Sequence, residues 1–239
     1  MSYATRIGHL KPEGAYQVLA KAQELEAKGR QIIHLEIGEP DFETFDNIKL
    51  AGIRAISEGK TKYTPPIGMK PLRDVIAQQA TLRYGIEIHP DQVVVSPGAK
   101  PNLFFPVLAL IEPGDEVIYP NPGFPSYEAM IRVAGGVPIP VPLREEKGFS
   151  FDLDAFRSLV THQTKLVILN SPGNPTGGVI PMEDIEEIAA IARNYNFWVM
   201  SDEIYSRVAY IDSSIPSIAP LPGMMDRTVI VDGFSKTYA

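Results

Sequence analysis

Hydrophobic residues recur at helical spacing in several stretches of the chain. Residues 14–28 place apolar side chains on one helical face, and the pattern stops at Gly29. Residues 70–84 and 182–195 repeat the pattern, and the second of these is the clearest amphipathic segment. Because an apolar side chain every three or four positions lines one side of a helix, these segments predict helices with one buried face. We also predict helices at 126–134 and 152–159, and a partly helical stretch at 42–58.

Shorter apolar runs lie between these helices and are typical of buried strands. Pro138 and Pro140 place one of them at a sheet edge or a bulge, because proline lacks the N–H that a central strand donates. Helices and strands alternate, so we predict an α/β fold of three layers, a mainly parallel sheet flanked by helices. The predicted strands cover residues 32–37, 92–95, 116–119, 136–141, 165–170, 197–201 and 229–232.

Polar side chains follow three of these runs. Asn174 lies beyond 165–170, Asp202 and Tyr205 end the next run, and Lys236 follows the last. The three sites are about 30 residues apart, the length of one βαβ repeat, and right-handed crossovers bring parallel strand ends to one edge. We therefore expect an amide, a carboxylate, a phenol and an amine to meet in one crevice. Simpler roles stay open: a helix cap for Asp202, a turn for Asn174 and a solvated surface charge for Lys236.

These groups suit pyridoxal 5′-phosphate, whose aldehyde takes a lysine amine and whose ring nitrogen needs an anionic partner to stay protonated. The chain resembles the fold-type-I pyridoxal-phosphate enzymes, specifically the class I/II aminotransferases of the aspartate aminotransferase superfamily. The resemblance extends over essentially the whole chain. Its motifs are LEIGEPDF at 35–42, TKYTPPIG at 61–68 and GFSKTYA at 233–239.

The resemblance assigns a role to each of the convergent groups. Lys236 would form the internal aldimine and then move a proton between the substrate Cα and the cofactor C4′. Asp202 would pair with the pyridinium nitrogen. Tyr205 and Asn174 would donate hydrogen bonds to the phenolate oxygen of the cofactor.

The cofactor phosphate is expected where the segment that follows Gln92 enters the apolar stretch 102–111. Backbone N–H groups at a helix start favour an anion, and small residues let it approach. The resemblance assigns these amides to Ala99 and Lys100, with a hydroxyl from Ser235. An ordinary turn at 97–98 is the alternative.

Three further positions match family motifs. Phe124 matches the aromatic that stacks on the cofactor ring, a contact of about 0.5–2 kcal/mol, and an ordinary core phenylalanine is the alternative. Gly38 matches the small residue whose backbone meets the substrate α-carboxylate, and a turn glycine is the alternative. Tyr63 matches a tyrosine that reaches a phosphate in the neighbouring subunit, which implies a homodimer with shared sites. A surface aromatic is the alternative there.

The resemblance also predicts how the chain is divided. We expect residues 1–45 to form an N-terminal arm and part of a small domain, and residues 46–239 to form the cofactor-binding large domain, incomplete at its C-terminus. The family motif continues beyond Lys236 to an arginine that grips the phosphate, and a later segment carries an arginine for the substrate α-carboxylate. Because the sequence stops at Ala239, we expect an incomplete record of a longer enzyme, poorly competent by itself.

Composition excludes several classes of function. A formal net charge of −7 argues against a nucleic-acid-binding surface. The sequence contains no cysteine, which excludes disulfides and thiolate catalysis, and its four histidines are too far apart to predict a metal site. Neither a signal core nor a membrane span is predicted, and we expect a cytoplasmic protein.

The favoured interpretation is transfer of an amino group from an L-amino acid to a 2-oxo acid through the Lys236 aldimine. In one subgroup of the family the lysine matching Lys100 assists recognition of a dicarboxylate, so aspartate or glutamate is the first substrate to test. Glu13 and Tyr16 lie in the entrance segment, where Glu13 would repel a second carboxylate, so aromatic and small neutral amino acids stay open. The same fold hosts C–S lyases, cyclising synthases and non-catalytic cofactor-binding modules, which are the alternatives.

Overall fold

The computed structural model describes residues 3–10, 14–210 and 214–239. Its centre is a six-stranded sheet in the order β3-β2-β1-β4-β5-β6. Every neighbouring pair is parallel except β2 and β3, which pair antiparallel at Leu143 and Arg144. The predicted α/β fold with a mainly parallel sheet is confirmed. The strands are β1 (Glu116–Asn121), β2 (Val137–Arg144), β3 (Ser150–Phe151), β4 (Thr164–Asn170), β5 (Trp198–Asp202) and β6 (Thr228–Val231).

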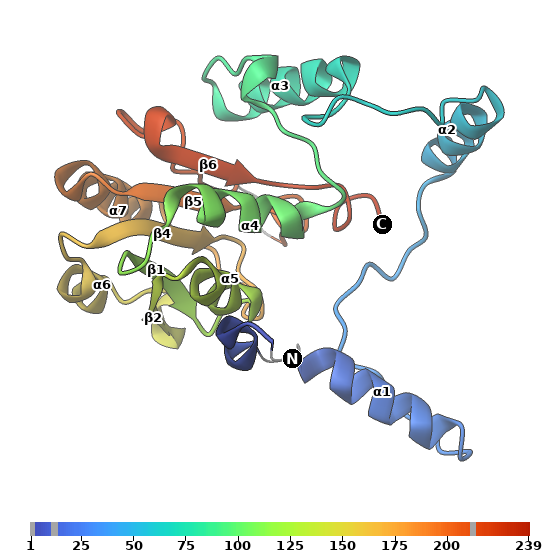
Figure 1. Cartoon of the computed structure of the whole chain (residues 1–239), viewed down its shortest axis with the longest axis horizontal. Helices are drawn as coiled ribbons and strands as arrows, with labels where there is room; N and C mark the ends of the chain where they lie inside the picture. The colour runs from blue at the N-terminus through green and yellow to red at the C-terminus, as the bar shows by residue number, and fades with distance from the viewer. Residues whose placement is uncertain (1–2, 11–13, 211–213) are drawn as a thin grey trace.

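Helices cover both faces of the sheet (Figure 1). The core on one face joins the sheet to α4 (Ala99–Leu110) and α5 (Ser126–Ala134), and the core on the other joins it to α6 (Leu153–Leu159) and α7 (Met182–Tyr195). Strand β4 supplies both cores, since alternate side chains of a strand point to opposite faces. Leu166 and Ile168 pack with α4 and α5, whereas Val167 and Leu169 pack with α6 and α7.

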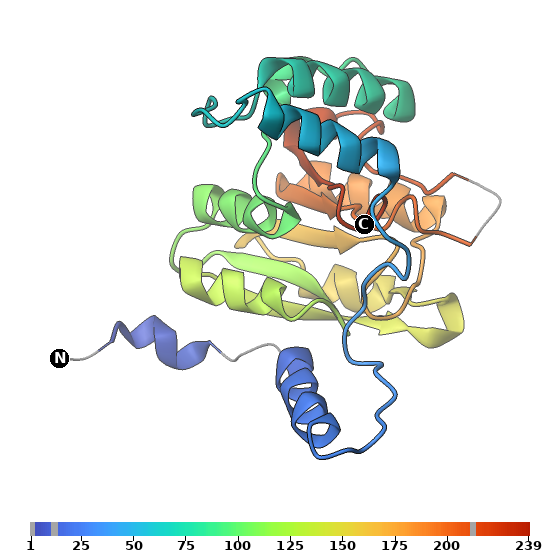
Figure 2. The same cartoon turned by 90° about the vertical axis from the view of Figure 1, so that its right-hand side faces the viewer.

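Three helices precede this core: α1 (Gly14–Glu26), α2 (Asp46–Ser57) and α3 (Lys70–Tyr84). Figure 1 shows α1 and α2 to the right of the sheet, joined by an extended segment, with α3 above β6, and Figure 2 shows α1 below the sheet. Helix α3 ends at Gly85, whose φ of 68° is the left-handed conformation that glycine adopts readily. Short 3₁₀ turns complete the described elements: η1 (Thr5–His9), η2 (Pro90–Gln92), η3 (Glu145–Lys147) and η4 (Met225–Arg227).

The predicted helices at 14–28, 70–84, 126–134, 152–159 and 182–195 are confirmed to within two residues at each end, and 42–58 is helical from 46 to 57. The prolines of β2 lie at an edge as predicted, because the described part of β3 reaches only Leu143 and Arg144. Two predicted strands, at 32–37 and 92–95, are wrong. Neither run pairs with a described strand, and Ile33 and Leu35 are 87% and 89% exposed. An apolar run forms a strand only where a partner satisfies its backbone.

Candidate active site

The carboxyl ends of β4, β5 and β6 lie side by side. Asn170 at the end of β4 is in register with Asp202 at the end of β5, which is in register with Val231 at the end of β6. The segments that carry Asn174 and Lys236 therefore leave the sheet at the same edge as Asp202. The predicted convergence of the three strand ends is confirmed.

Asp202 is a buried acid, only 3% exposed. Its Oδ2 accepts a hydrogen bond of 2.6 Å from the Tyr127 hydroxyl, and its Oδ1 accepts one of 3.3 Å from the Ile204 amide. Burial raises the pKa of Asp202 to about 6, against the opposing effect of these two donors. A cation placed beside such a carboxyl would favour its charged form strongly.

Asn174 and Tyr205 point toward each other across the β4 and β5 ends, with Nδ2 of Asn174 3.4 Å from the Tyr205 hydroxyl. Asn170 holds this arrangement, because its side chain accepts from the Asn174 amide at 2.8 Å and donates to the Asp202 carbonyl at 3.1 Å. Burial, followed by the negative charge of Asp202, raises the pKa of Tyr205, so the phenol stays protonated. The pair thus offers two neutral donors on one side of the site.

The Lys236 amine lies beside two other predicted residues. Its Nζ donates a hydrogen bond of 2.9 Å to the Gly38 carbonyl and lies 5.9 Å from the centre of the Tyr205 ring. The extended segment that precedes α2 therefore passes next to the lysine, although the two are almost 200 positions apart in the sequence.

The loop before Lys236 packs on the start of α4. A Cβ added at Gly233 would lie 2.9 Å from Cδ1 of Ile204 and 3.5 Å from Cβ of Ala99, so the lysine loop approaches the first residue of α4 to van der Waals distance. Gly98, with a φ of 87°, precedes the first turn of the helix, which begins at Ala99. The first turn of α4 thus adjoins the lysine loop.

Phe124 is joined to the buried acid through Tyr127. The two rings pack edge to face with centres 5.6 Å apart, and the Lys100 amine lies 5.4 Å from the centre of the Phe124 ring. Ser235 and Tyr63 are exposed, Tyr63 fully so in the loop between α2 and α3. Within the described residues, neither forms a hydrogen bond, ion pair or ring contact with the other predicted site residues. Glu13 lies outside the described residues, and Tyr16 is 59% exposed on α1.

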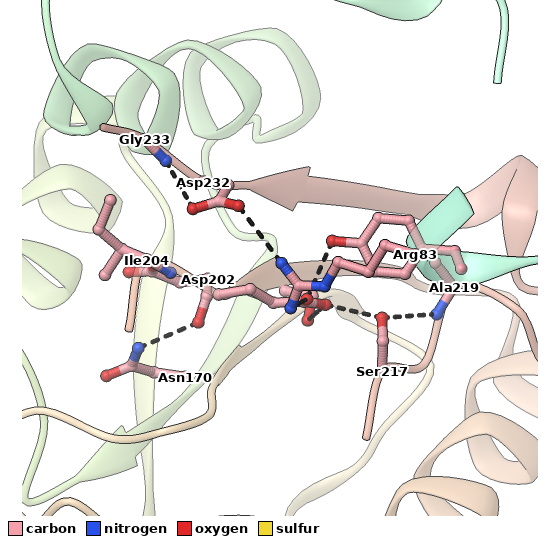
Figure 3. A network of polar contacts seen from close by, with 11 residues as sticks. Arg83, Asn170, Asp202, Ile204, Ser217, Ala219, Asp232 and Gly233 are labelled. Atoms are coloured by element: carbon pink, nitrogen blue, oxygen red, sulfur yellow. Dashed lines mark hydrogen bonds and ion pairs between the residues drawn. The ribbon is translucent and has the colours of Figure 1, made fainter. Parts of the chain in front are cut away.

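A polar network that the residue patterns did not predict lies behind Asp202 (Figure 3). Glu203 is 1% exposed and pairs with Arg83 of α3, which also contacts Asp232. Burial raises the pKa of both acids. The position of Glu203 directly after an apolar strand could have predicted this network, because a buried carboxylate needs hydrogen-bond or ion-pair partners. Tyr127 was missed because it shares a helical face with Met130 and Ile131 and is typical of a core aromatic.

The part of the chain that the structure describes holds no cluster of three or more side chains that could bind a metal ion. No described helix has both the length and the apolar character needed to cross a membrane.

Comparison with known proteins places these residues in a family context. The family described as aminotransferase class I and II matches residues 30–239. A probable aspartate/prephenate aminotransferase of Aquifex aeolicus is 43% identical over 99% of the chain and 60% of that relative. A bifunctional aspartate aminotransferase and glutamate/aspartate-prephenate aminotransferase of Petunia hybrida is 42% identical over the whole chain and 50% of its own length.

Solved structures of aspartate aminotransferases are also similar to this chain. The aspartate aminotransferase of Thermus thermophilus with maleate superposes with a TM-score of 0.95 at 38% identity, over the whole chain and 62% of that structure. The aspartate aminotransferase of Thermotoga maritima gives a TM-score of 0.93 at 39% identity, over 99% of the chain and 63% of that structure. The chain thus spans less than two thirds of the length of the proteins that it matches.

Proposed function

The chain belongs to the aminotransferase class I and II family, and from this premise we propose that it binds pyridoxal 5′-phosphate where β4, β5 and β6 end and serves amino-group transfer from an L-amino acid to a 2-oxo acid. The observation that carries the proposal is the buried carboxyl of Asp202 at the same sheet edge as the Lys236 amine. The named relatives are aminotransferases, which does not favour the lyase, synthase or non-catalytic alternatives.

The residues at the site fit the chemistry of this cofactor, which supplies an electron sink for charge that develops at the substrate Cα. Asp202 would hold the proton on the ring nitrogen, a position that suits an acid with one tyrosine and one amide donor. Asn174 and Tyr205 would donate to the phenolate oxygen, as their convergence supports. Lys236 would hold the cofactor aldehyde and then accept and return the proton at the substrate Cα.

The phosphate and substrate contacts complete the proposal. The first-turn amides of α4, at Ala99 and Lys100, would bind the phosphate, with the Ser235 hydroxyl beside them. Phe124 would stack on the ring, and the Gly38 backbone would meet the substrate α-carboxylate. Support for this set comes from the packing of Gly233 on Ala99 and from the Lys236–Gly38 hydrogen bond.

For the substrate we propose a dicarboxylic amino acid, aspartate or glutamate. The relatives named for aspartate and prephenate transamination support this choice, as does the exposed cation of Lys100 near Phe124. We further propose a homodimer in which Tyr63 reaches the partner's phosphate. The division at residue 45 and a cytoplasmic location remain predictions from the sequence.

An absorbance titration tests the proposed function. The protein mixed with pyridoxal 5′-phosphate should develop the visible band of a lysine-bound cofactor, and aspartate or glutamate should convert it to the band of the aminated cofactor. Lys236→Ala should abolish the band, whereas Lys165→Ala, a change at an exposed lysine of β4, should leave it intact. A Lys236→Ala variant that still turned over would refute the assignment.

A further inference from the structure

Arg83, at the C-terminal end of α3, bridges two strand ends of the proposed site (Figure 3). Its Nη2 donates to Glu203 at 2.9 Å, and its Nη1 donates to Asp232 at 3.4 Å. Glu203 directly follows Asp202, and Asp232 follows β6, four residues before Lys236. One guanidinium thus connects the segments that carry the proposed cofactor acid and the proposed cofactor amine.

Glu203 is held in a single position. One carboxylate oxygen accepts from Arg83 and from the Tyr84 hydroxyl at 3.0 Å, and the other accepts from Ser201 at 3.0 Å and Ser217 at 2.7 Å. Donors on both oxygens fix this buried carboxylate in place and oppose the rise in its pKa that burial causes. Its backbone amide also donates to the Val231 carbonyl at 2.8 Å, which ties the β5 end to β6.

Three carboxylates lie close together at this edge, and Arg83 pairs with two of them. After burial, the charges of Asp232 and Glu203 raise the pKa of Asp202, while Tyr127 of α5 and the Ile204 amide lower it. The other charged or titratable groups nearby are Tyr205, which faces Asp202, and Arg207, whose charge lowers the pKa of Asp232. Arg83 therefore supplies one positive charge that Glu203 and Asp232 share, and Arg207 adds a second that acts on Asp232.

We propose that Arg83 is a positioning residue of the cofactor site: its single positive charge, shared by Glu203 and Asp232, favours the anionic form of Asp202, and its two hydrogen bonds fix the two strand ends that carry Asp202 and Lys236. A role for Arg83 in catalysis rests on the proposed function. Its effect on the pKa of Asp202 does not, and that pKa can be measured in the cofactor-free protein.

A purely structural role for Arg83, as an anchor of α3, is the competing explanation. Desolvation offsets much of the attraction in a buried ion pair, yet removing one partner of such a pair destabilises the fold. Arg73 offers a control, because it is a second arginine of α3 and is itself buried. It donates to the carbonyls of Gly68 and Pro90 and contacts Asp91, and no recorded contact joins it to the strand ends.

The test is a carboxyl ¹³C NMR titration of the cofactor-free protein, with the Asp202 signal assigned by its loss in Asp202→Asn. Arg83→Met should raise the pKa of Asp202 by about one unit, because a unit charge several ångströms away changes an ionisation equilibrium roughly tenfold at an effective dielectric constant near 20. Glu203→Gln should lower it, because a negative neighbour is lost. Arg73→Met should leave it unchanged.

The opposite signs distinguish the two explanations, since an anchor acting through α3 alone predicts no such reversal. No shift in Arg83→Met, or shifts of the same sign in Arg83→Met and Glu203→Gln, would overturn the proposal. Should Arg83→Met not fold, Arg83→Gln together with the downward shift in Glu203→Gln decides the question.

Binding of pyridoxal 5′-phosphate gives an independent measurement. Arg83→Met should weaken binding by about twofold at pH 7 and by close to tenfold at pH 5, because a one-unit rise from a pKa of about 6 lowers the anionic fraction of Asp202 by these factors. Adding Glu203→Gln should recover much of that loss, because the uncompensated charge is then gone. A double variant as weak as Arg83→Met would contradict the electrostatic mechanism. A wild-type protein that binds no cofactor would refute the proposed function instead, while the NMR titration would still decide the role of Arg83.

Discussion

At the scale of a single residue, Asp202 shows how burial sets the pH range in which a carboxyl is charged. Its pKa lies near 6 in the folded protein and near 3.8 when exposed. Between these values the folded protein holds a proton that the unfolded chain has released, so the free energy of unfolding falls as the pH rises. Above pH 6 the whole cost of the buried charge persists. The site is therefore less stable without its proposed cationic partner.

Asp202→Asn should stabilise the cofactor-free protein at pH 7.5, because the amide removes the buried charge and still accepts from Tyr127. The shift of the pKa from 3.8 to about 6 corresponds to about 3 kcal/mol at 1.36 kcal/mol per unit. Urea denaturation at pH 7.5 and pH 4 measures the difference from wild type, which should vanish at the lower pH. An equal difference at both values would contradict this account. The same variant should bind pyridoxal 5′-phosphate more weakly.

Tyr127→Phe keeps the Asp202 carboxyl but removes one of its two hydrogen-bond donors. The 2.6 Å hydrogen bond from Tyr127 lowers the pKa of Asp202, so its loss should raise that pKa and move cofactor binding to higher pH. Leaving a buried carboxylate oxygen unpaired should also cost about 1–3 kcal/mol of stability. Tyr119→Phe is the control, since Tyr119 donates to Glu128 at 3.2 Å. An equal shift in the pH dependence of cofactor binding in Tyr119→Phe would show that loss of the Tyr127 hydrogen bond is not the cause.

Residue patterns predicted the polar groups at the strand ends, but not the side chains that hold those groups in place. Lys236, Asp202 and Asn174 each follow an apolar run, and that position alone implies the carboxyl edge of a parallel sheet. Tyr127 and Arg83 give no such signal, because each lies in an amphipathic helix and meets its partner 75 or 120 positions away. Side-chain pairings between distant elements depend on helix rotation over the sheet, which sequence periodicity does not determine.

At the scale of an element, the start of α4 depends on one glycine. Gly98 has φ 87° and ψ 171°, a conformation essentially confined to glycine, and it sets the direction of the first-turn amides. Gly114, in the turn after the same helix, has φ 100°. A Cβ at either position would have no atom within 4 Å, so both alanine substitutions act through backbone strain alone.

Gly98→Ala and Gly114→Ala should therefore lower stability by similar amounts, about 1–3 kcal/mol. Only Gly98→Ala should weaken binding of pyridoxal 5′-phosphate, by about tenfold, because it displaces the amides proposed to bind the phosphate. Binding of pyridoxal, which lacks the phosphate, should change equally little in both variants. Equal losses of phosphate-dependent affinity in the two variants would rule out this role for the α4 start.

Helix prediction succeeded where each helix carries its own signal. Residues 70–84 match α3 because the apolar stripe, Pro71 at the start and Gly85 at the end all act locally. The run at 32–37 has the same apolar character as β6 but no neighbouring strand, and strand formation depends on that neighbour. Local patterns therefore predict helices more securely than strands in this chain.

At the scale of the whole molecule, the segment before α4 leaves many large apolar side chains in solvent. They include Ile33, Leu35, Ile53, Ile56 and Tyr63, each at least 60% exposed. Large apolar side chains with this much exposure are candidates for burial in an interface. The proposed homodimer would cover such a surface, and a two-fold arrangement would bring Tyr63 of each subunit to the partner's site.

Subunit mixing tests this arrangement directly. Tyr63→Phe should weaken cofactor binding in its own homodimer, and Lys236→Ala should abolish the lysine-bound cofactor. If Tyr63 serves the partner's site, a mixed dimer holds one site with both native residues. Random pairing of equal amounts should then restore about a quarter of the tight wild-type sites. Titration of the visible band with pyridoxal 5′-phosphate before and after subunit exchange measures that recovery.

The control mixes Lys236→Ala with a variant that carries both substitutions, from which no tight site can form under either arrangement. If Tyr63 instead served its own subunit, mixing Tyr63→Phe with Lys236→Ala would also restore nothing, because each native residue would stay with a defective partner in the same chain. Recovery in the first mixture and none in the control therefore requires a site built from two subunits. Its absence, with subunit exchange verified by native mass spectrometry, would show that the exposed Tyr63 has another role.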